Sequence, residues 1–343
     1  MDSEERVLRA LNLEEPDQVP MFELGINDPK VEEILGRRMT DEESTEMFVT
    51  AYRKLKLDIV PTWLDELIFY KGGIDPVGRE YYWDEEARTD WYVRGLVKNE
   101  ADLEKFSPDP SDERYYKRTK KTVKLAKEDL FILGAMNGPF QYVSQSMGLE
   151  YFLRGFYLSP DLMKRSFDLR TRFVIETAKR MIDLGVDGII LCEDSADTHG
   201  PHISPRLYEE YVFPCHRRCV EEIGKTVPVL VHCCGSIWPI IDLLFKAGFA
   251  GIHPLEPVAG MNIRRVKEKY GDKWCLLGNV DCSQTLCIKD KNEVVEETKL
   301  CLESAAPGGG LILSSSNSVH NAVKIENFLE MLRTGRKYGR YPM

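Results

Sequence analysis

His232 and Cys234 stand two residues apart, at the end of the apolar run Val229–Cys233. Neutral imidazole and thiolate are ligands that Zn²⁺ prefers, and a catalytic zinc site needs three such ligands with a fourth position open. Both side chains could reach one ion if the backbone turns at Gly235. The structural alternative is a buried cysteine that packs as a small apolar residue. The pair indicates a zinc site whose remaining ligand lies elsewhere in the sequence.

Glu193 and Asp194 follow a second apolar run, Gly188–Cys192. Two adjacent carboxylates at the end of a buried strand are costly unless they are paired, hydrogen-bonded or metal-bound. One interpretation makes both residues catalytic, with Glu193 as a metal ligand or either residue as a general base. The alternative is that one of them caps the following segment or binds an arginine.

The elements that must position these residues are eight apolar runs that alternate with helical patterns. Such runs are typical of parallel strands buried on both faces, and eight of them favour a (β/α)₈ TIM barrel with an N-terminal extension. We expect a single domain over residues 1–343. The expected strands are Val19–Leu24, Asp58–Thr62, Leu130–Ala135, Gly188–Cys192, Val229–Cys233, Phe249–His253, Trp274–Gly278 and Leu311–Ser315.

In such a barrel the carboxyl ends of the strands form the active-site mouth. Polar and aromatic residues that follow several of the expected strands would therefore face the substrate. The predicted substrate-binding residues are Phe22, Glu23, Trp63, Tyr142 and Asn317.

An insertion of about residues 80–98 interrupts this alternation after the second strand. Tyr81–Trp83 and Trp91–Val93 flank the polar segment DEEARTD, which predicts an antiparallel β-hairpin. The hairpin would cover one mouth of the barrel, or it would form a lid or dimer surface rich in aromatic residues. The sequence is compatible with a homo-oligomer but does not specify one.

Charge and hydropathy exclude two classes of partner. Lys and Arg number 46 against 56 Asp and Glu, for a net charge of −10, so no basic surface is expected to bind nucleic acid. The longest apolar runs are far shorter than a membrane span. The charged N-terminus is not expected to act as a secretory signal, so the nine cysteines are expected to be reduced thiols of a cytoplasmic enzyme.

Six stretches of the sequence resemble the uroporphyrinogen decarboxylase-like superfamily, and together they cover nearly the whole chain. This resemblance implies the same (β/α)₈ barrel. The stretches are RVLRALNLEEPDQVP (6–20), GPFQYVSQSMGLEYFL (138–153), ISPRLYEEYVFP (203–214), HCCG (232–235), LLGNVD (276–281) and GGGLILSSSNS (308–318).

The superfamily divides by chemistry. Its decarboxylases are metal-free and grip substrate carboxylates with an N-terminal arginine motif, but the corresponding segment here, VPMFELGIN, carries an acid instead. A tetracarboxylate would also be repelled by a mouth lined with acidic residues. Those residues are Glu23, Asp65, Glu66, Glu193 and Asp194.

The cobamide-dependent methyltransferase branch holds zinc with His-x-Cys and a distant cysteine. His232 and Cys234 match the first two ligands, whereas Asn317 stands where the distant cysteine is expected. Asparagine is a poor zinc ligand, so Glu193 or another group would complete the site. An oxygen ligand would make zinc a harder Lewis acid, better suited to an ether or hydroxyl oxygen than to a thiol.

The resemblance therefore predicts a zinc-dependent methyltransferase. It would move a methyl group between a small methylated compound, such as a methoxylated aromatic, and the corrinoid (cobalamin) of a partner corrinoid protein. Two alternatives stay open: a metal-independent decarboxylase of the uroporphyrinogen type, and a non-catalytic ligand-binding homologue.

Overall fold

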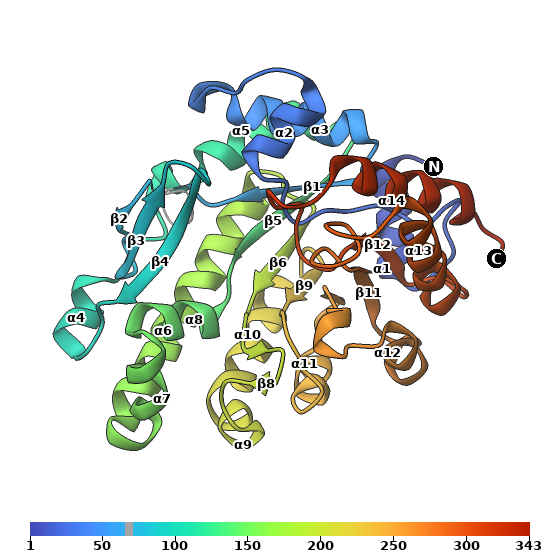
Figure 1. Ribbon diagram of the computed structural model, residues 1–343. Helices are drawn as coiled ribbons and strands as arrows, with labels where there is room; N and C mark the ends of the chain where they lie inside the picture. Colours follow the sequence, from blue (N-terminus) through green and yellow to red (C-terminus); the bar gives the residue numbers. More distant parts are fainter. Residues whose placement is uncertain (66–70) are drawn as a thin grey trace.

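The computed structural model describes residues 1–65 and 71–343 and is built around one parallel sheet (Figure 1). The sheet has seven strands in the order β1-β5-β6-β9-β10-β11-β12, and every neighbouring pair is parallel. It curls, and helices pack along its outer side. The strands are β1 (Ile59–Trp63), β5 (Phe131–Asn137), β6 (Gly188–Cys192), β9 (Val229–His232), β10 (Gly251–His253), β11 (Cys275–Val280) and β12 (Leu311–Ser315).

The expected first strand, Val19–Leu24, is not a strand in the structure. It makes a single parallel bridge, between Met21 and Leu313 of β12. The Leu313 amide donates to the carbonyl of Pro20, and the Asp58 amide before β1 donates to the carbonyl of Met21. Pro20 itself has no N–H to donate to a ladder. The prediction of a parallel α/β fold is confirmed, but this segment only spans the two edges of a seven-stranded sheet and is not an eighth strand.

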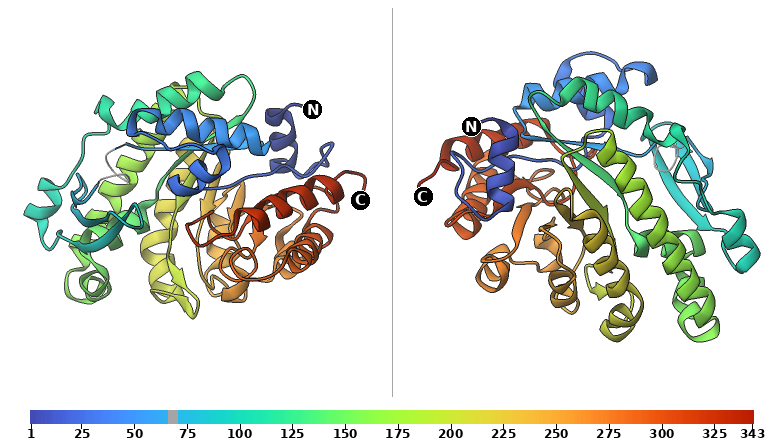
Figure 2. Two further views of the ribbon diagram at one scale, coloured as in Figure 1. Left: turned by 45° about the horizontal axis from the view of Figure 1, so that its top comes forward. Right: turned by 180° about the vertical axis from the view of Figure 1, so that it is seen from behind.

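Some of the helices that cover the sheet begin at a proline or at a capping side chain. Pro160 opens the long helix α8, and the hydroxyl of Ser204 accepts the Leu207 amide at the start of α9. Figure 2 shows the same layering from two further sides. The α-helices are α1 (Ser3–Leu11), α2 (Asp28–Leu35), α3 (Ser44–Leu55), α4 (Glu100–Lys105), α5 (Lys117–Ala126), α6 (Pro139–Met147), α7 (Leu149–Leu158), α8 (Pro160–Asp183), α9 (Pro205–Leu207), α10 (Phe213–Ile223), α11 (Ile241–Ala247), α12 (Ile263–Tyr270), α13 (Lys291–Ala305) and α14 (Ile325–Tyr338). Short 3₁₀ turns cover Asp41–Glu43, Glu113–Tyr116 and Pro257–Ala259, and a π-helical turn over Tyr208–Val212 leads into α10.

Alternating side chains divide the interior into two cores. Residues such as Ile59, Ile190 and Ile312 point to the inside of the curled sheet, and Val7 and Leu11 of α1 join them. The remaining apolar side chains pack between the sheet and the outer helices. The Arg6 guanidinium of α1 pairs with Asp58, directly before β1, at 2.7 Å. Helix α1 therefore lies at the amino ends of the strands. The candidate site residues were expected at the opposite, carboxyl ends.

The insertion forms a three-stranded antiparallel sheet, in which β3 (Arg79–Asp84) pairs with β4 (Thr89–Gly95) and with the short β2 (Gly73–Ile74). It packs on α6, where the Tyr92 hydroxyl donates to the carbonyl of Gln145 at 2.8 Å. A Cβ atom at Gly95 would lie 2.3 Å from that carbonyl oxygen, so this contact requires glycine. A further short pair joins β7 (Ala196–Asp197) to β8 (Gly200–Pro201).

No helix within residues 1–65 and 71–343 combines the length and the apolar character that crossing a membrane requires.

Candidate metal centre

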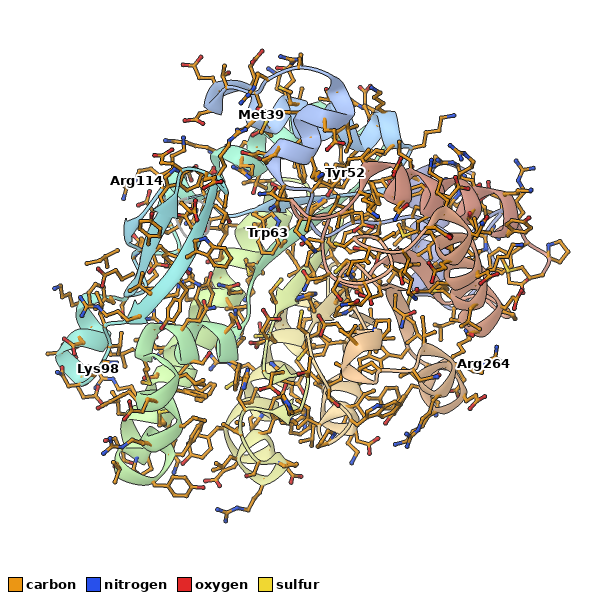
Figure 3. All side chains as sticks on the ribbon, viewed as in Figure 1. Met39, Tyr52, Trp63, Lys98, Arg114 and Arg264 are labelled. Atoms are coloured by element: carbon orange, nitrogen blue, oxygen red, sulfur yellow. The ribbon has the colours of Figure 1, made fainter. Side chains whose placement is uncertain are left out.

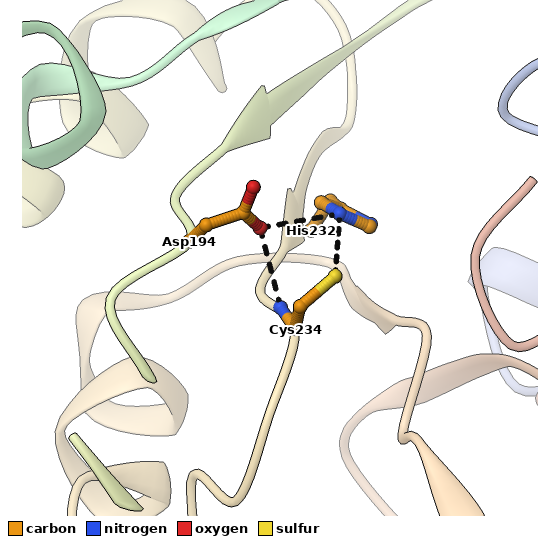
Figure 4. A group of neighbouring side chains, drawn as sticks. All are labelled: Asp194, His232 and Cys234. Carbon is orange, nitrogen blue, oxygen red and sulfur yellow. Dashed lines mark hydrogen bonds and ion pairs between the residues drawn. The ribbon is translucent and has the colours of Figure 1, made fainter. Parts of the chain in front are cut away.

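Three potential ligand atoms converge at the carboxyl ends of β6 and β9 (Figure 4). The strands are parallel neighbours with Cys192 opposite His232, so the residues that follow them lie side by side. The Nε2 atom of His232 lies 3.2 Å from Sγ of Cys234 and 3.4 Å from Oδ1 of Asp194. All three ligand atoms lie within 4.8 Å of one another. One imidazole, one thiol and one carboxylate therefore face a common point.

The backbone turn after Cys234 depends on glycine. Gly235 has a φ of +82°, and a Cβ atom there would lie 2.5 Å from the carbonyl oxygen of Asp197. The Ser236 amide donates to that same carbonyl at 2.7 Å, and the Gly235 amide donates to Oε2 of Glu256 at 2.8 Å. These bonds hold the turn that brings Cys234 back toward His232.

A second histidine lies behind His232. Nδ1 of His232 is 2.7 Å from Nδ1 of His253, which is completely buried at the end of β10. Nε2 of His232 is thereby left facing Cys234 and Asp194. Sequence reasoning did not single out His253 as a site residue, although its place at the end of the neighbouring strand was a usable signal.

The structure does not bring Glu193 to this centre. Its carboxylate is buried, accepts the amides of Phe140 and Gln141 at the start of α6, and pairs with Nε2 of His216 at 2.7 Å. The expectation that Glu193 completes the ligand set is therefore corrected, because its oxygens are already occupied by helix capping. Its neighbour Asp194, whose side chain is 42% exposed, faces His232 and Cys234 instead.

Asn317, among the predicted substrate residues, does reach the centre. Its Nδ2 donates to Sγ of Cys234 at 3.1 Å, and its Oδ1 accepts the hydroxyl of Ser318. The side-chain amide therefore stands beside the thiol without adding a second sulfur.

The other predicted substrate residues lie in different surroundings. Trp63, labelled in Figure 3, is half-buried at the end of β1. Phe22 is buried edge-on against the ring of His253, with ring centroids 5.5 Å apart. Tyr142 lies in a separate cluster, with the Arg79 guanidinium over one ring face and Phe173 beside it. Tyr142 therefore packs in the core, between the insertion and α8, where a substrate contact was predicted.

Glu23 is also completely buried, and the amide and hydroxyl of Ser315 donate to its carboxylate at 2.9 and 2.7 Å. Burial raises the pKa of Glu23 to about 8, although these two hydrogen bonds oppose the shift. The side chain therefore bonds to β12, beside the segment that spans the sheet edges.

The expected acidic mouth carries less negative charge than its number of acidic residues suggests. Glu23 carries a raised pKa, Glu193 is paired with His216, and Asp65 pairs with Arg118 at 3.6 Å. Glu66 lies outside the described residues. These residues would therefore repel a polycarboxylate substrate less than their number suggests.

The sequence model of the family described as uroporphyrinogen decarboxylase (URO-D) matches residues 2–338. The chain belongs to this family. The predicted resemblance is confirmed over almost the whole length. The URO-D family name covers more than one chemistry, as its relatives show.

Relatives of both kinds are similar to the chain. The methylcobamide:CoM methyltransferase MtaA of Methanosarcina barkeri is 24% identical over 197 residues, which cover 55% of this chain and 56% of that enzyme. The chain thus matches little more than half the length of that relative. A uroporphyrinogen decarboxylase of Geobacter sulfurreducens is 24% identical over 251 residues, 69% of each chain.

A solved methyltransferase from Methanosarcina mazei superposes with a TM-score of 0.82 at 20% identity, covering 98% of this chain and 99% of that one. At this identity the likeness shows the shared fold.

The chemistry of the donor set fits a zinc ion. Nitrogen, sulfur and carboxylate oxygen are all zinc ligands, and three protein ligands leave a position for a substrate. Burial, followed by the charge of Asp194, raises the pKa of the Cys234 thiol well above its usual value. A bound cation would displace that thiol proton, as metal binding to cysteine does generally. His232, Cys234 and Asp194 are thus the residues that would hold it.

Proposed function

We propose that this URO-D family member is a zinc-dependent methyltransferase that moves a methyl group between a small methylated compound and the corrinoid of a partner protein. The observation that carries the proposal is the convergence of His232, Cys234 and Asp194 on one point. Methylcobamide-dependent enzymes among the relatives support the reaction class. Zinc bound at this point would act as a Lewis acid on the heteroatom that carries the methyl group.

The residues of the chain prepare this site in two ways. The side chains of His232 and Cys234 are held by their strand-end turn, whereas Asp194 is partly exposed and leaves the centre open to an incoming compound. The amide of Asn317 donates to Sγ of Cys234, which draws charge from the sulfur. A single thiolate with a hydrogen-bond donor gives less charge to a metal than two thiolates would.

This ligand set favours an oxygen-bound methyl group. A carboxylate and one thiolate form a harder site than a pair of thiolates, and hard Lewis acids prefer ether and hydroxyl oxygen. A methoxylated aromatic is the substrate class that we propose. The ring of Trp63, half-buried at the end of β1, is the aromatic side chain that would pack against it.

The proposal is tested by zinc content and methyl transfer measured on the same preparations. Wild-type protein should hold about one zinc per chain after dialysis. It should methylate reduced cobalamin from a methoxylated aromatic faster than from a methylated thiol. Cys234→Ala should lose the zinc and the transfer.

Two alternative outcomes would contradict the proposal. Decarboxylation of a porphyrinogen by metal-free protein, undiminished in Cys234→Ala, would establish the decarboxylase reading that the Geobacter relatives represent. Tight binding of a methylated compound without zinc or turnover would identify a non-catalytic binding homologue.

A further inference from the structure

The imidazoles of His232 and His253 share one short hydrogen bond. The two residues are paired in register on β9 and β10, and their Nδ1 atoms lie 2.7 Å apart. Their rings are tilted by 31° with centroids 4.9 Å apart, and both residues are nearly inaccessible, at 4% and 0% exposure. Water therefore has little opportunity to replace either partner.

A single proton lies between the two Nδ1 atoms. Two bare nitrogens at this distance would repel each other, and two N–H groups would clash, so one ring donates and the other accepts. A neutral imidazole carries its proton on one nitrogen only. If His253 donates, His232 carries its proton on Nε2, the atom that faces Cys234 and Asp194. If His232 donates, its Nε2 presents a lone pair to the same two groups.

Only the second arrangement can bind a cation through Nε2. It requires His253 to accept at Nδ1 and to carry its own proton on Nε2. That Nε2 atom is buried, and the backbone of Ser315 lies near the His253 ring as a potential acceptor. A backbone carbonyl can only accept, so it favours a proton on the ring nitrogen that faces it.

We propose that His253 is a positioning residue that accepts the Nδ1 proton of His232 and thereby holds His232 in the tautomer able to bind a metal through Nε2. Two contacts keep His253 in place: its carbonyl accepts the Cys233 amide at 2.9 Å, and the Phe22 ring packs on it edge-on. This inference rests on the metal centre of the proposed function, but not on which methyl compound reacts there.

Two variants of His253 separate hydrogen bonding from packing. His253→Phe keeps a flat ring in the same space and removes the acceptor. His253→Gln retains a side-chain oxygen that can accept from Nδ1. Outer partners of metal-binding histidines change affinity by about 10- to 100-fold, so His253→Phe should weaken zinc binding by that factor and His253→Gln should recover most of it. Competition with a chromophoric chelator measures the affinity, and thermal melting of the metal-free proteins verifies folding.

Nitrogen-15 NMR of the wild type provides a test that does not depend on any variant. The chain has six histidines, so the imidazole signals can be assigned one by one. In the zinc-loaded protein His232 should show a protonated Nδ1, and His253 should show an unprotonated Nδ1 with a protonated Nε2. Zinc bound at Nδ1 of His232, or equal affinity for wild type and His253→Phe, would overturn the inference.

These measurements remain distinct from the test of function. Zinc binding with the predicted tautomers but no transfer to cobalamin would refute the methyltransferase proposal and leave the role of His253 standing. Methyl transfer with normal zinc affinity in His253→Phe would do the reverse.

Discussion

Glu23 should make the stability of the protein depend on pH in a window where few carboxylates titrate. Burial raises its pKa from the ordinary 4.5 to about 8, against two hydrogen bonds from Ser315. Between these pH values the folded protein holds a proton that the unfolded chain has released. The free energy of unfolding therefore falls as the pH rises through this window.

The size of the effect follows from the two pKa values. They differ by about 3.5, and each pKa unit corresponds to about 1.4 kcal/mol, which gives about 5 kcal/mol in full. The part that falls between about pH 6 and about pH 9 is about 2–3 kcal/mol. Glu23→Gln keeps the shape and a side-chain oxygen for Ser315 but cannot ionise. It should remove that part of the pH dependence.

Urea unfolding at the two pH values measures the effect. Relative to the wild type, Glu23→Gln should gain about 2–3 kcal/mol in the free energy of unfolding between the lower and the higher pH, because only the wild type has a buried carboxyl group at this position that must ionise. Glu32→Gln is a matched control: despite some burial, the Met39 amide and Arg88 lower the pKa of Glu32, so it is already ionised at both values. Parallel pH profiles for wild type and Glu23→Gln would refute the assignment of a raised pKa to Glu23.

Three further predictions concern the site and the insertion. Asp194→Asn should weaken zinc binding by more than about 100-fold, which exceeds the effect of residues that only hydrogen-bond to a zinc ligand. Glu193→Gln should retain the zinc affinity but lower the free energy of unfolding by about 3 kcal/mol. Equal zinc affinity for the two variants would contradict the assignment of Asp194, and not Glu193, as the ligand. Asn317→Cys should add a second thiolate, raising the sulfur count in zinc X-ray absorption spectra from one to two and slowing transfer from methoxylated donors. Gly95→Ala should lower the free energy of unfolding by about 1–3 kcal/mol because its Cβ would meet α6, whereas Gly25→Ala, with its nearest contact at 3.7 Å, should change it little in thermal melting.

The strands of the sheet could be predicted from the sequence because each is a continuous apolar run. Gly188–Cys192 and Leu311–Ser315 were predicted with the bounds that the structure shows. The first predicted strand failed for a local reason. Pro20 lacks an N–H, and the Ser315 amide donates to the side chain of Glu23 instead of to a backbone carbonyl, so regular pairing stops there.

The candidate site could be located but not completed. His232 and Cys234 lie within two residues of one strand end, so their proximity is a local property of the chain. The choice of the carboxylate that lies beside them is not determined by the local sequence. It depends on the amide of Gln141 and on His216, far away in the sequence, which together occupy Glu193 and leave Asp194 to face the centre.

The same limit applies to aromatic residues. Tyr142 stands on a helix beside the expected mouth, yet its partners are Arg79 of the insertion and Phe173 of α8. Helical spacing alone does not distinguish the side that faces a substrate from the side that faces another helix.

The rate of methyl transfer to reduced cobalamin, measured before and after zinc is removed, tests most directly whether the protein is a zinc-dependent methyltransferase. Methylation is followed from the change in the cobalamin spectrum, with a methoxylated aromatic as the donor. The structure predicts transfer by the protein as purified, loss of transfer after chelation, and recovery when about one equivalent of zinc is restored. Transfer at an unchanged rate in fully stripped protein would contradict a zinc centre on His232, Cys234 and Asp194.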